Sequence, residues 1–173
     1  MKIFKTALVL TLVGIACGLL IGLANQITAP IIADNKLKAE LAAYEALFPE
    51  ITGSEVKAFD GTLVYEVLVA TKDDVVIGYL VKGKQSNAFG YIDMIVGFDV
   101  SGKVIGIEII DFNQTPSYQA GIKERTDQFI GVALDNILAK GPQIDATAGG
   151  TSQGFNVVKA IMAEAVTAYK AVK

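Results

Sequence analysis

The sequence predicts an α+β protein: one apolar N-terminal helix, followed by a single domain with a twisted antiparallel sheet and packed helices. Three observations support this fold class. Residues 7–24 contain no charge and no proline. The middle of the chain holds short apolar segments separated by polar or glycine-containing turns, which is typical of antiparallel strands. The last part of the chain shows the apolar spacing of a helix packed on a sheet.

The composition limits the chemistry open to this chain. Its 173 residues suffice for one ordinary domain and one additional element. There is no histidine, and Cys17 is the single cysteine. These counts exclude Ser-His-Asp and Cys-His catalysis, an intrachain disulfide, a zinc cluster and a four-cysteine iron–sulfur site. A net charge of -3 disfavours a nucleic-acid surface. Any redox chemistry in this chain would need an organic cofactor.

The apolar run at residues 7–24 is a candidate transmembrane helix. Roughly 20 residues at about 1.5 Å each span the hydrocarbon core of a bilayer, and Ile3, Phe4 and Ile27 extend the run. We predict an anchor over residues 1–27 and an exterior domain over residues 28–173. The alternative is a cleaved signal peptide, but no small-x-small cleavage site follows the run.

Lysines and glycines suggest how this helix is used. Lys2 and Lys5 lie closer to the apolar run than the lysines that follow it, which favours a cytoplasmic N-terminus and an exterior domain. Gly14, Gly18 and Gly22 recur every four residues. This stripe would allow close packing against another membrane helix, although glycine is common in membrane helices generally.

A second helix is expected over residues 31–47, where apolar residues return on one side. Thr28 can cap this helix, and Pro30 fits its first turn. Phe48 and Pro49 end it.

Four strands are expected in the middle of the chain. Residues 63–70 and 75–82 form one pair, joined by a polar turn, and residues 91–99 and 104–111 form another. Gly102 supplies the positive φ that a tight hairpin needs. Alternating isoleucines in the last strand predict one strongly apolar face.

The remaining elements are helices and loops. A polar loop covers residues 113–120, and residues 121–138 show a helical pattern that is broken near Gly131. The final helix is expected over residues 155–169, with an apolar stripe at i, i+4, i+8 spacing.

The acidic residues indicate no catalytic pair. Glu40 and Glu45 are expected to be solvated, and alternation places Asp93 at the surface. No two carboxylates are positioned for acid–base catalysis.

The run from Asp145 to Ser152, just before the last helix, is the strongest functional indication. Gly149 and Gly150 free the backbone to turn tightly and let a ligand approach. The hydroxyl of Thr151 follows at a helix N-terminus, where free N–H groups can bind a phosphate. A plain turn with a helix N-cap would explain the same run.

Further stretches accompany this turn along the chain: residues 27–32 (ITAPII), 90–92 (GYI), 102–103 (GK), 105–107 (IGI) and 114–117 (QTPS). In this order they resemble the FMN-binding G subunit of Rnf-type electron transport complexes. They are more distantly similar to the C subunit of the sodium-pumping NADH:quinone oxidoreductase. The Gln-Thr-Pro-Ser stretch stands where this family has Glu-Thr-Pro-Gly.

The flavinylation signature of this family runs Asp, two variable positions, Ser or Thr, Gly, Ala, Thr. Asp145, Gly149 and Thr151 match its Asp, Gly and acceptor Thr. Ala148 stands where Ser or Thr is usual, and Gly150 stands where Ala is usual.

The resemblance implies that FMN is attached to Thr151 through a phosphoester bond. The phosphate would lie beside the free backbone N–H groups at the start of the last helix. Ser152 belongs to the same turn. The resemblance also implies that the isoalloxazine ring lies near a loop with Tyr118 as a stacking partner. The cofactor-binding residues of that loop are Gln114, Thr115, Pro116 and Tyr118.

The function implied by the resemblance is that of a membrane-anchored, extracytoplasmic FMN-binding subunit. It would relay electrons within an ion-translocating ferredoxin:NAD oxidoreductase complex rather than act as a self-contained enzyme. The expected partners are other membrane subunits of the complex and a Mg-dependent flavin transferase that attaches FMN from FAD. Two alternatives stay open: a structural subunit that has lost its flavin, or a stand-alone extracytoplasmic FMN-binding electron-transfer module.

Overall fold

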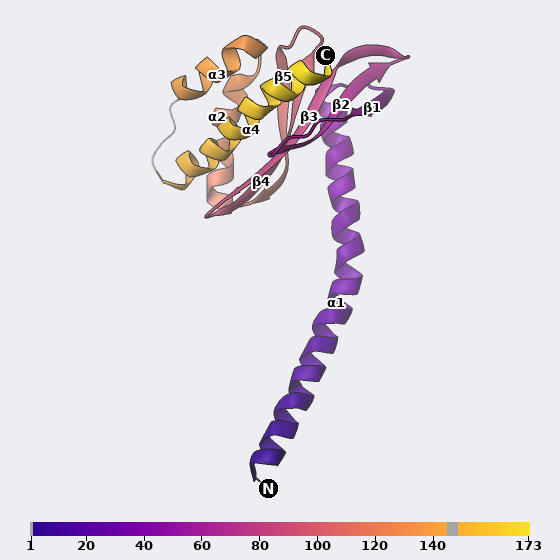
Figure 1. Cartoon of the computed structure of the whole chain (residues 1–173), viewed down its shortest axis with the longest axis vertical. Coiled ribbons are helices and arrows are strands. Elements are labelled where there is room, and N and C mark those ends of the chain that lie inside the picture. Colours follow the sequence, from indigo (N-terminus) through magenta and orange to yellow (C-terminus); the bar gives the residue numbers. More distant parts are fainter. Residues whose placement is uncertain (1, 145–148) are drawn as a thin grey trace. The chain divides into compact units, whose positions relative to one another are not determined.

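The computed structural model describes residues 2–144 and 149–173. Its internal contacts divide the chain into two compact units, one ending at Ala39 and the other covering Glu40–Lys173. Figure 1 shows the elements coloured along the chain.

Helix α1 (Lys2–Leu47) is long and apolar enough to cross a membrane. Its most apolar 18-residue window has a mean hydropathy of 2.6, and none of that window is buried. By length and composition this helix fits a single-pass membrane anchor.

The expectation of a new helix beginning near Thr28 is wrong, because α1 continues through Pro30. The Thr28 hydroxyl donates a hydrogen bond to the Ala24 carbonyl at 2.9 Å, four residues back, instead of capping a new helix. Pro30 removes one backbone donor from the helix, and the intrahelical bonds on both sides keep it continuous.

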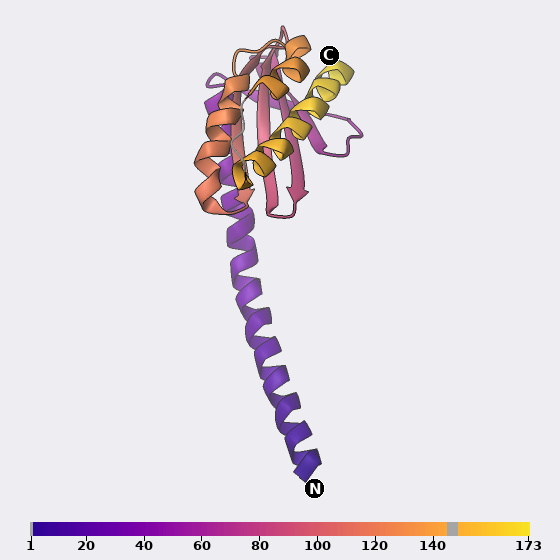
Figure 2. The ribbon, with the colours of Figure 1, turned by 90° about the vertical axis from the view of Figure 1, so that its left-hand side faces the viewer.

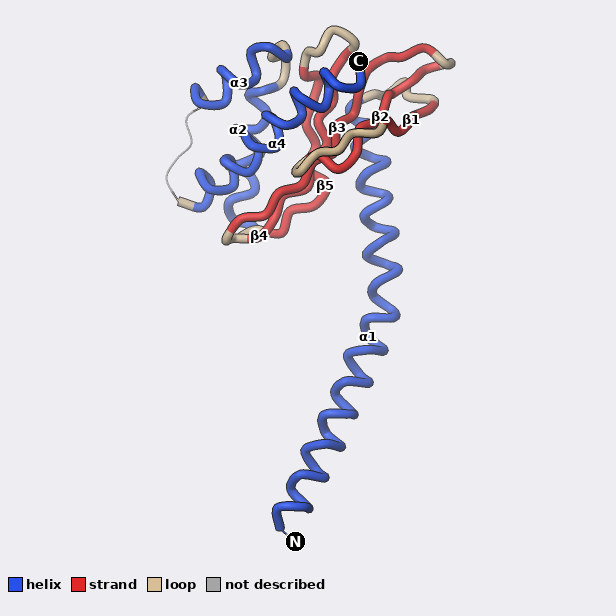
Figure 3. Tube along the Cα trace, viewed as in Figure 1, coloured by secondary structure: helices blue, strands red, loops and turns tan. Residues whose placement is uncertain are grey.

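The second unit contains one sheet in which every neighbouring pair of strands is antiparallel and the spatial order follows the chain (Figure 3). The strands are β1 (Gly53–Lys57), β2 (Val64–Lys72), β3 (Val75–Asn87), β4 (Gly90–Asp99) and β5 (Val104–Asn113). Both expected hairpins are confirmed. Strand β1 was not expected, because its sequence GSEVK contains only one apolar residue.

Turn chemistry shapes both expected hairpins. Gly102 has a φ of 87°, as predicted, and Asp73 and Asp74 adopt φ values of 49° and 64° in the β2–β3 turn. The single apolar face expected for β5 is wrong. A bulge near Gly97 and Phe98 interrupts the β4–β5 register. As a result Ile105 and Ile107 pack in different core clusters.

In the described part of the chain, the sheet is followed by α2 (Gln119–Thr126), α3 (Ile137–Lys140) and α4 (Gly150–Val172). Short 3-10 turns lie before α2 at η1 (Pro116–Tyr118) and after it at η2 (Asp127–Phe129), η3 (Leu134–Asn136) and η4 (Gly141–Gln143). The predicted break near Gly131 is confirmed, since this residue has a φ of 84°. Helix α4 begins five residues before the predicted start.

The sheet has a core on each face. Helix α4 crosses one face with α2 and α3 beside it (Figure 2), and Phe98, Phe155 and Tyr169 are buried there. On the other face, Leu47 and Phe48 at the end of α1 pack with the sheet. Each fully buried large apolar side chain contributes about 1.5–3 kcal/mol to stability. This packing places the loop after β5 beside the first turn of α4.

Candidate functional site

The first turn of α4 begins with a glycine at the N-cap position. Gly149 has φ 85° and ψ -147°, a conformation that favours glycine, and no side chain of the described residues caps the helix. The hydroxyl cap considered for this run is therefore not found. The Gln153 N–H donates to the Gly149 carbonyl at 3.2 Å, and the three preceding amides lack an intrahelical acceptor. Asp145 and Ala148 lie outside the described residues.

Tyr118 lies directly against this turn. A Cβ added to Gly150 would be 2.3 Å from Tyr118 Cε2, so the aromatic ring occupies the space that a methyl group would need. This contact is a physical reason for a glycine at position 150. It also brings the loop after β5 to the first turn of α4.

Gln114 lies beside the next turn of α4. It is only 8% exposed, and a Cβ on Gly154 would meet its Oε1 at 2.9 Å. Its Nε2 donates to Asn87 Oδ1 at 3.2 Å, and Asn87 Nδ2 donates to the Gln153 carbonyl at 3.2 Å. These bonds tie the ends of β3 and β5 to α4.

Thr151 is half-buried against α2. A Cβ on Gly121 would lie 3.3 Å from Thr151 Cγ2 and 3.5 Å from its Oγ1. Ser152 is the next residue of the same turn and is also half-buried. The acceptor proposed from the sequence therefore faces a second helix whose backbone is bare at this point.

Thr115 and Pro116 shape the loop. The Thr115 carbonyl accepts a hydrogen bond from the Tyr118 N–H at 3.0 Å, which closes the η1 turn. Pro116 lines a hollow of about 380 Å³ together with Gln119 and Lys123. The described contacts of these two residues do not include Thr151.

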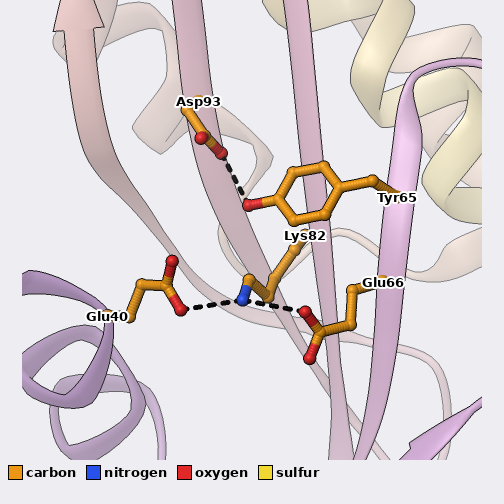
Figure 4. Close-up of polar contacts among 5 residues, drawn as sticks. All are labelled: Glu40, Tyr65, Glu66, Lys82 and Asp93. Atoms are coloured by element: carbon orange, nitrogen blue, oxygen red, sulfur yellow. Dashed lines mark hydrogen bonds and ion pairs between the residues drawn. The ribbon is translucent and has the colours of Figure 1, made fainter. Parts of the chain in front are cut away.

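A second polar cluster, which we call the lysine cluster, comprises Lys82, Glu40 and Glu66 (Figure 4). The Lys82 side chain is 5% exposed, and its Nζ lies 2.8 Å from Glu40 Oε2 and 3.0 Å from Glu66 Oε2. Burial lowers the pKa of Lys82, but the hydrogen bonds to Glu40 and Glu66 outweigh it and hold the pKa above its ordinary value. The expectation of a solvated Glu40 is wrong, because this residue pairs with a buried cation.

Tyr65 and Asp93 lie next to the lysine cluster (Figure 4). The Tyr65 hydroxyl donates to Asp93 Oδ1 at 2.9 Å, and Asp93 is fully buried. The predicted surface position of Asp93 is therefore wrong. Burial, followed by the neighbouring Asp93 charge, raises the pKa of Tyr65, which keeps its hydroxyl protonated as a donor.

Known proteins of one family match the chain over most of its length. A family model described as the RnfG N-terminal region matches residues 1–47. The G subunit of the Na⁺-translocating ferredoxin:NAD⁺ oxidoreductase complex of Acetobacterium woodii is 26% identical over 180 aligned positions, covering 95% of this chain and 84% of that protein. The G subunit of an ion-translocating oxidoreductase complex of Methanosarcina acetivorans is 30% identical over 127 residues, covering 70% of this chain and 68% of that protein. The chain belongs to the Rnf G-subunit family.

Membership of the Rnf G-subunit family confirms the predicted resemblance. The names of both relatives assign them to ion-translocating oxidoreductase complexes, so other subunits of such a complex are implied as partners. The matched N-terminal region contains the apolar helix α1. Among residues 2–144 and 149–173, no group of His, Cys, Asp or Glu side chains could hold a metal ion.

Replacing Gly150 with alanine in this member of the Rnf G-subunit family is expected to destabilise it. In Gly150→Ala the new methyl group would overlap the Tyr118 ring. Overpacking costs about 1–3 kcal/mol, and we expect about 1 kcal/mol, the low end, because the Tyr118 side chain is partly exposed and can move. Thermal unfolding of the full chain measures this cost. Adding Tyr118→Ala should make the alanine at position 150 harmless, whereas an equal cost in both backgrounds would contradict the contact.

Proposed function

We propose that this chain is a membrane-anchored flavoprotein subunit that relays electrons through FMN attached covalently to Thr151. It would act within an ion-translocating ferredoxin:NAD oxidoreductase complex. The observation that carries the proposal is the position of Thr151. Its hydroxyl lies in the first turn of α4, directly after two glycines, at the acceptor position of the family signature.

The first turn of α4 suits a phosphoester. The helix N-terminus presents free N–H groups and a partial positive charge, both of which favour a phosphate. Among residues 2–144 and 149–173, no atom would lie within 4 Å of a Cβ on Gly149, which is consistent with room for a phosphate beside this turn. Attachment from FAD would join Thr151 Oγ1 to the FMN phosphorus, with AMP as the leaving group and the hydroxyl proton released.

FMN would supply the redox chemistry, and the side chains of the chain would position it. Tyr118, in contact with Gly150, offers an aromatic ring beside the attachment point. Gln114 is buried beside the next turn of α4 and leaves this position without a charge. A flavin transferase would be required for maturation.

We further propose that the N-terminus is cytoplasmic and the domain extracytoplasmic, as the lysines before the apolar run favour. Gly14, Gly18 and Gly22 would form the packing face toward partner subunits. A Cβ on any of these glycines would meet nothing within 4 Å, so the stripe is open in the single chain.

In-gel fluorescence tests the proposal. The full chain is produced in cells that contain the transferase and run on a denaturing gel, where only covalent flavin stays with the band. A fluorescent band supports the proposal, and a dark band would leave the structural subunit as the better account. Copurification of several membrane subunits would separate the complex from a stand-alone FMN-binding module.

The charge at position 114 is expected to tune the flavin. Gln114→Glu adds a negative charge beside α4 and opposes the gain of electrons, so we expect the reduction potential to fall. A change of about 30 mV corresponds to about 1.4 kcal/mol for a two-electron couple. Spectroelectrochemical titration of the flavinylated chain measures the shift. Gln119→Glu adds the same charge at an exposed position, and solvent screening should keep its effect small. An unchanged or raised potential in Gln114→Glu would contradict the expectation.

A further inference from the structure

Arg125 is a cation of α2 that lies near the contact of this helix with Thr151. Arg125 Nη1 donates a hydrogen bond to the Gly121 carbonyl at 2.8 Å, one turn earlier in the same helix. This bond orients the guanidinium along α2. The sequence contains no other arginine, so the chain places its single guanidinium on the helix that contacts Thr151.

The guanidinium of Arg125 and the hydroxyl of Thr151 both lie close to the bare backbone of Gly121. A Cβ on Gly121 would be 3.5 Å from Arg125 Nη1 and 3.5 Å from Thr151 Oγ1. The two atoms are therefore at most about twice that distance apart. A charge-assisted hydrogen bond to phosphate spans about 2.8 Å, so a phosphate bonded to Oγ1 would be within reach of the guanidinium.

Gly121 keeps this space open. It lies inside an α-helix and has no positive φ, so its backbone would accept alanine. Glycine in a helix interior is less favourable than alanine by roughly 0.5–1 kcal/mol. A local packing requirement is the simplest reason to keep it here.

We propose that Gly121 and Arg125 form the phosphate-binding side of the Thr151 site. The bare backbone at Gly121 leaves room for a phosphoester on Thr151 Oγ1, and the guanidinium of Arg125 donates hydrogen bonds to its oxygens. The charge of the phosphoester then lies between the N-terminus of α4 and a fixed cation. This inference rests on the proposed attachment of FMN to Thr151, and it names the residues that position the phosphate.

The test compares variants of the full chain, each produced with and without the transferase. The rate of flavin attachment is followed by intact mass, and the thermal midpoint is measured for the apo and flavinylated forms. Arg125→Ala should slow attachment about tenfold, the rate effect of losing one charge-assisted hydrogen bond. It should also reduce the rise in midpoint that flavinylation produces. Arg125→Lys should recover only part of both effects.

Gly121→Ala separates positioning from folding. It should change the apo midpoint little, because the helix preference of alanine offsets the tight 3.3 Å contact of the new methyl group with Thr151 Cγ2. It should nevertheless slow attachment, because the methyl group would lie within 3.5 Å of both the hydroxyl and the guanidinium. The matched control is Lys123→Ala, which removes a neighbouring cation of α2 that pairs with Asp127. This control should load flavin like the wild type.

Two failures are distinguishable. If the wild-type chain never gains covalent FMN, both the proposed function and this inference are overturned. If the wild type loads FMN, and Arg125→Ala loads it at the same rate with the same rise in midpoint, only the role of Gly121 and Arg125 is overturned.

Discussion

Replacing Lys82 with methionine is expected to lower the free energy of unfolding of the second unit by about 3 kcal/mol. Methionine keeps most of the side-chain volume but removes the charge that Glu40 and Glu66 share. The side chains of these two glutamates are only 16% and 28% exposed. Two poorly solvated carboxylates would then lie near each other without a counter-charge. Since domains have about 5–15 kcal/mol of stability, the loss is large.

The pH dependence of this contribution has a definite sign. Burial lowers the folded-state pKa of Lys82, but the hydrogen bonds that Lys82 donates to Glu40 and Glu66 raise it above that of the unfolded chain. The stabilisation by this group is therefore complete below the ordinary lysine pKa. It is lost only as the pH rises through the higher folded-state pKa.

Urea unfolding of the full chain in detergent measures the effect by the near-UV circular dichroism of tyrosine. All six tyrosines lie beyond residue 40, so the signal reports the second unit. Lys57→Met is the matched control, because its ion pair with Glu55 is exposed and should contribute less than about 1 kcal/mol. Adding Glu40→Gln and Glu66→Gln to Lys82→Met should restore part of the stability. Equal losses at Lys82 and Lys57 would contradict the role of the lysine cluster.

Thr151→Ala is expected to abolish covalent flavin. The substitution removes the hydroxyl oxygen to which the phosphoester is assigned, while alanine is compatible with the first turn of α4. Production with the transferase, followed by denaturation and removal of free flavin, should leave no flavin absorbance. Wild-type protein treated in the same way should keep it.

Ser152→Ala is the matched control for this prediction. It removes a neighbouring hydroxyl from the same turn of α4 and should leave covalent flavin unchanged. A loss of flavin in Ser152→Ala together with its retention in Thr151→Ala would move the attachment site by one residue and contradict the assignment.

Much of the sheet was predictable because its information is local. Alternating apolar residues and the turn at Gly102 were sufficient for both hairpins. The end of α1 at Leu47 was also predictable, but its continuity through Pro30 was not, because Thr28 and Pro30 resemble a helix start. Both residues also fit inside a helix when the hydroxyl bonds to the preceding turn. Local patterns do not distinguish these two arrangements.

The lysine cluster could not be predicted because its partners are far apart in the sequence. Glu40 and Lys82 are 42 residues apart. Alternation puts Lys82 and Asp93 on the face of the sheet opposite α4 but does not show what covers each of them. Lys82 is buried and pairs with Glu40 and Glu66. Asp93 is buried and accepts a hydrogen bond from Tyr65.

The Thr151 site was predictable in part. The family resemblance named the acceptor and the loop with Gln114 and Tyr118, and the structure brings these residues to the start of α4. The family resemblance did not indicate Gly121 and Arg125. The helical pattern at residues 121–138 covered both but did not indicate which face meets Thr151.

The intact mass of the full chain, purified from cells that contain the flavin transferase, is the decisive measurement for covalent FMN on Thr151. We expect the mass to exceed that of the unmodified chain by one FMN less one water. Fragmentation should place this increment on Thr151. An unmodified mass under these conditions, or an increment on another residue, would contradict it.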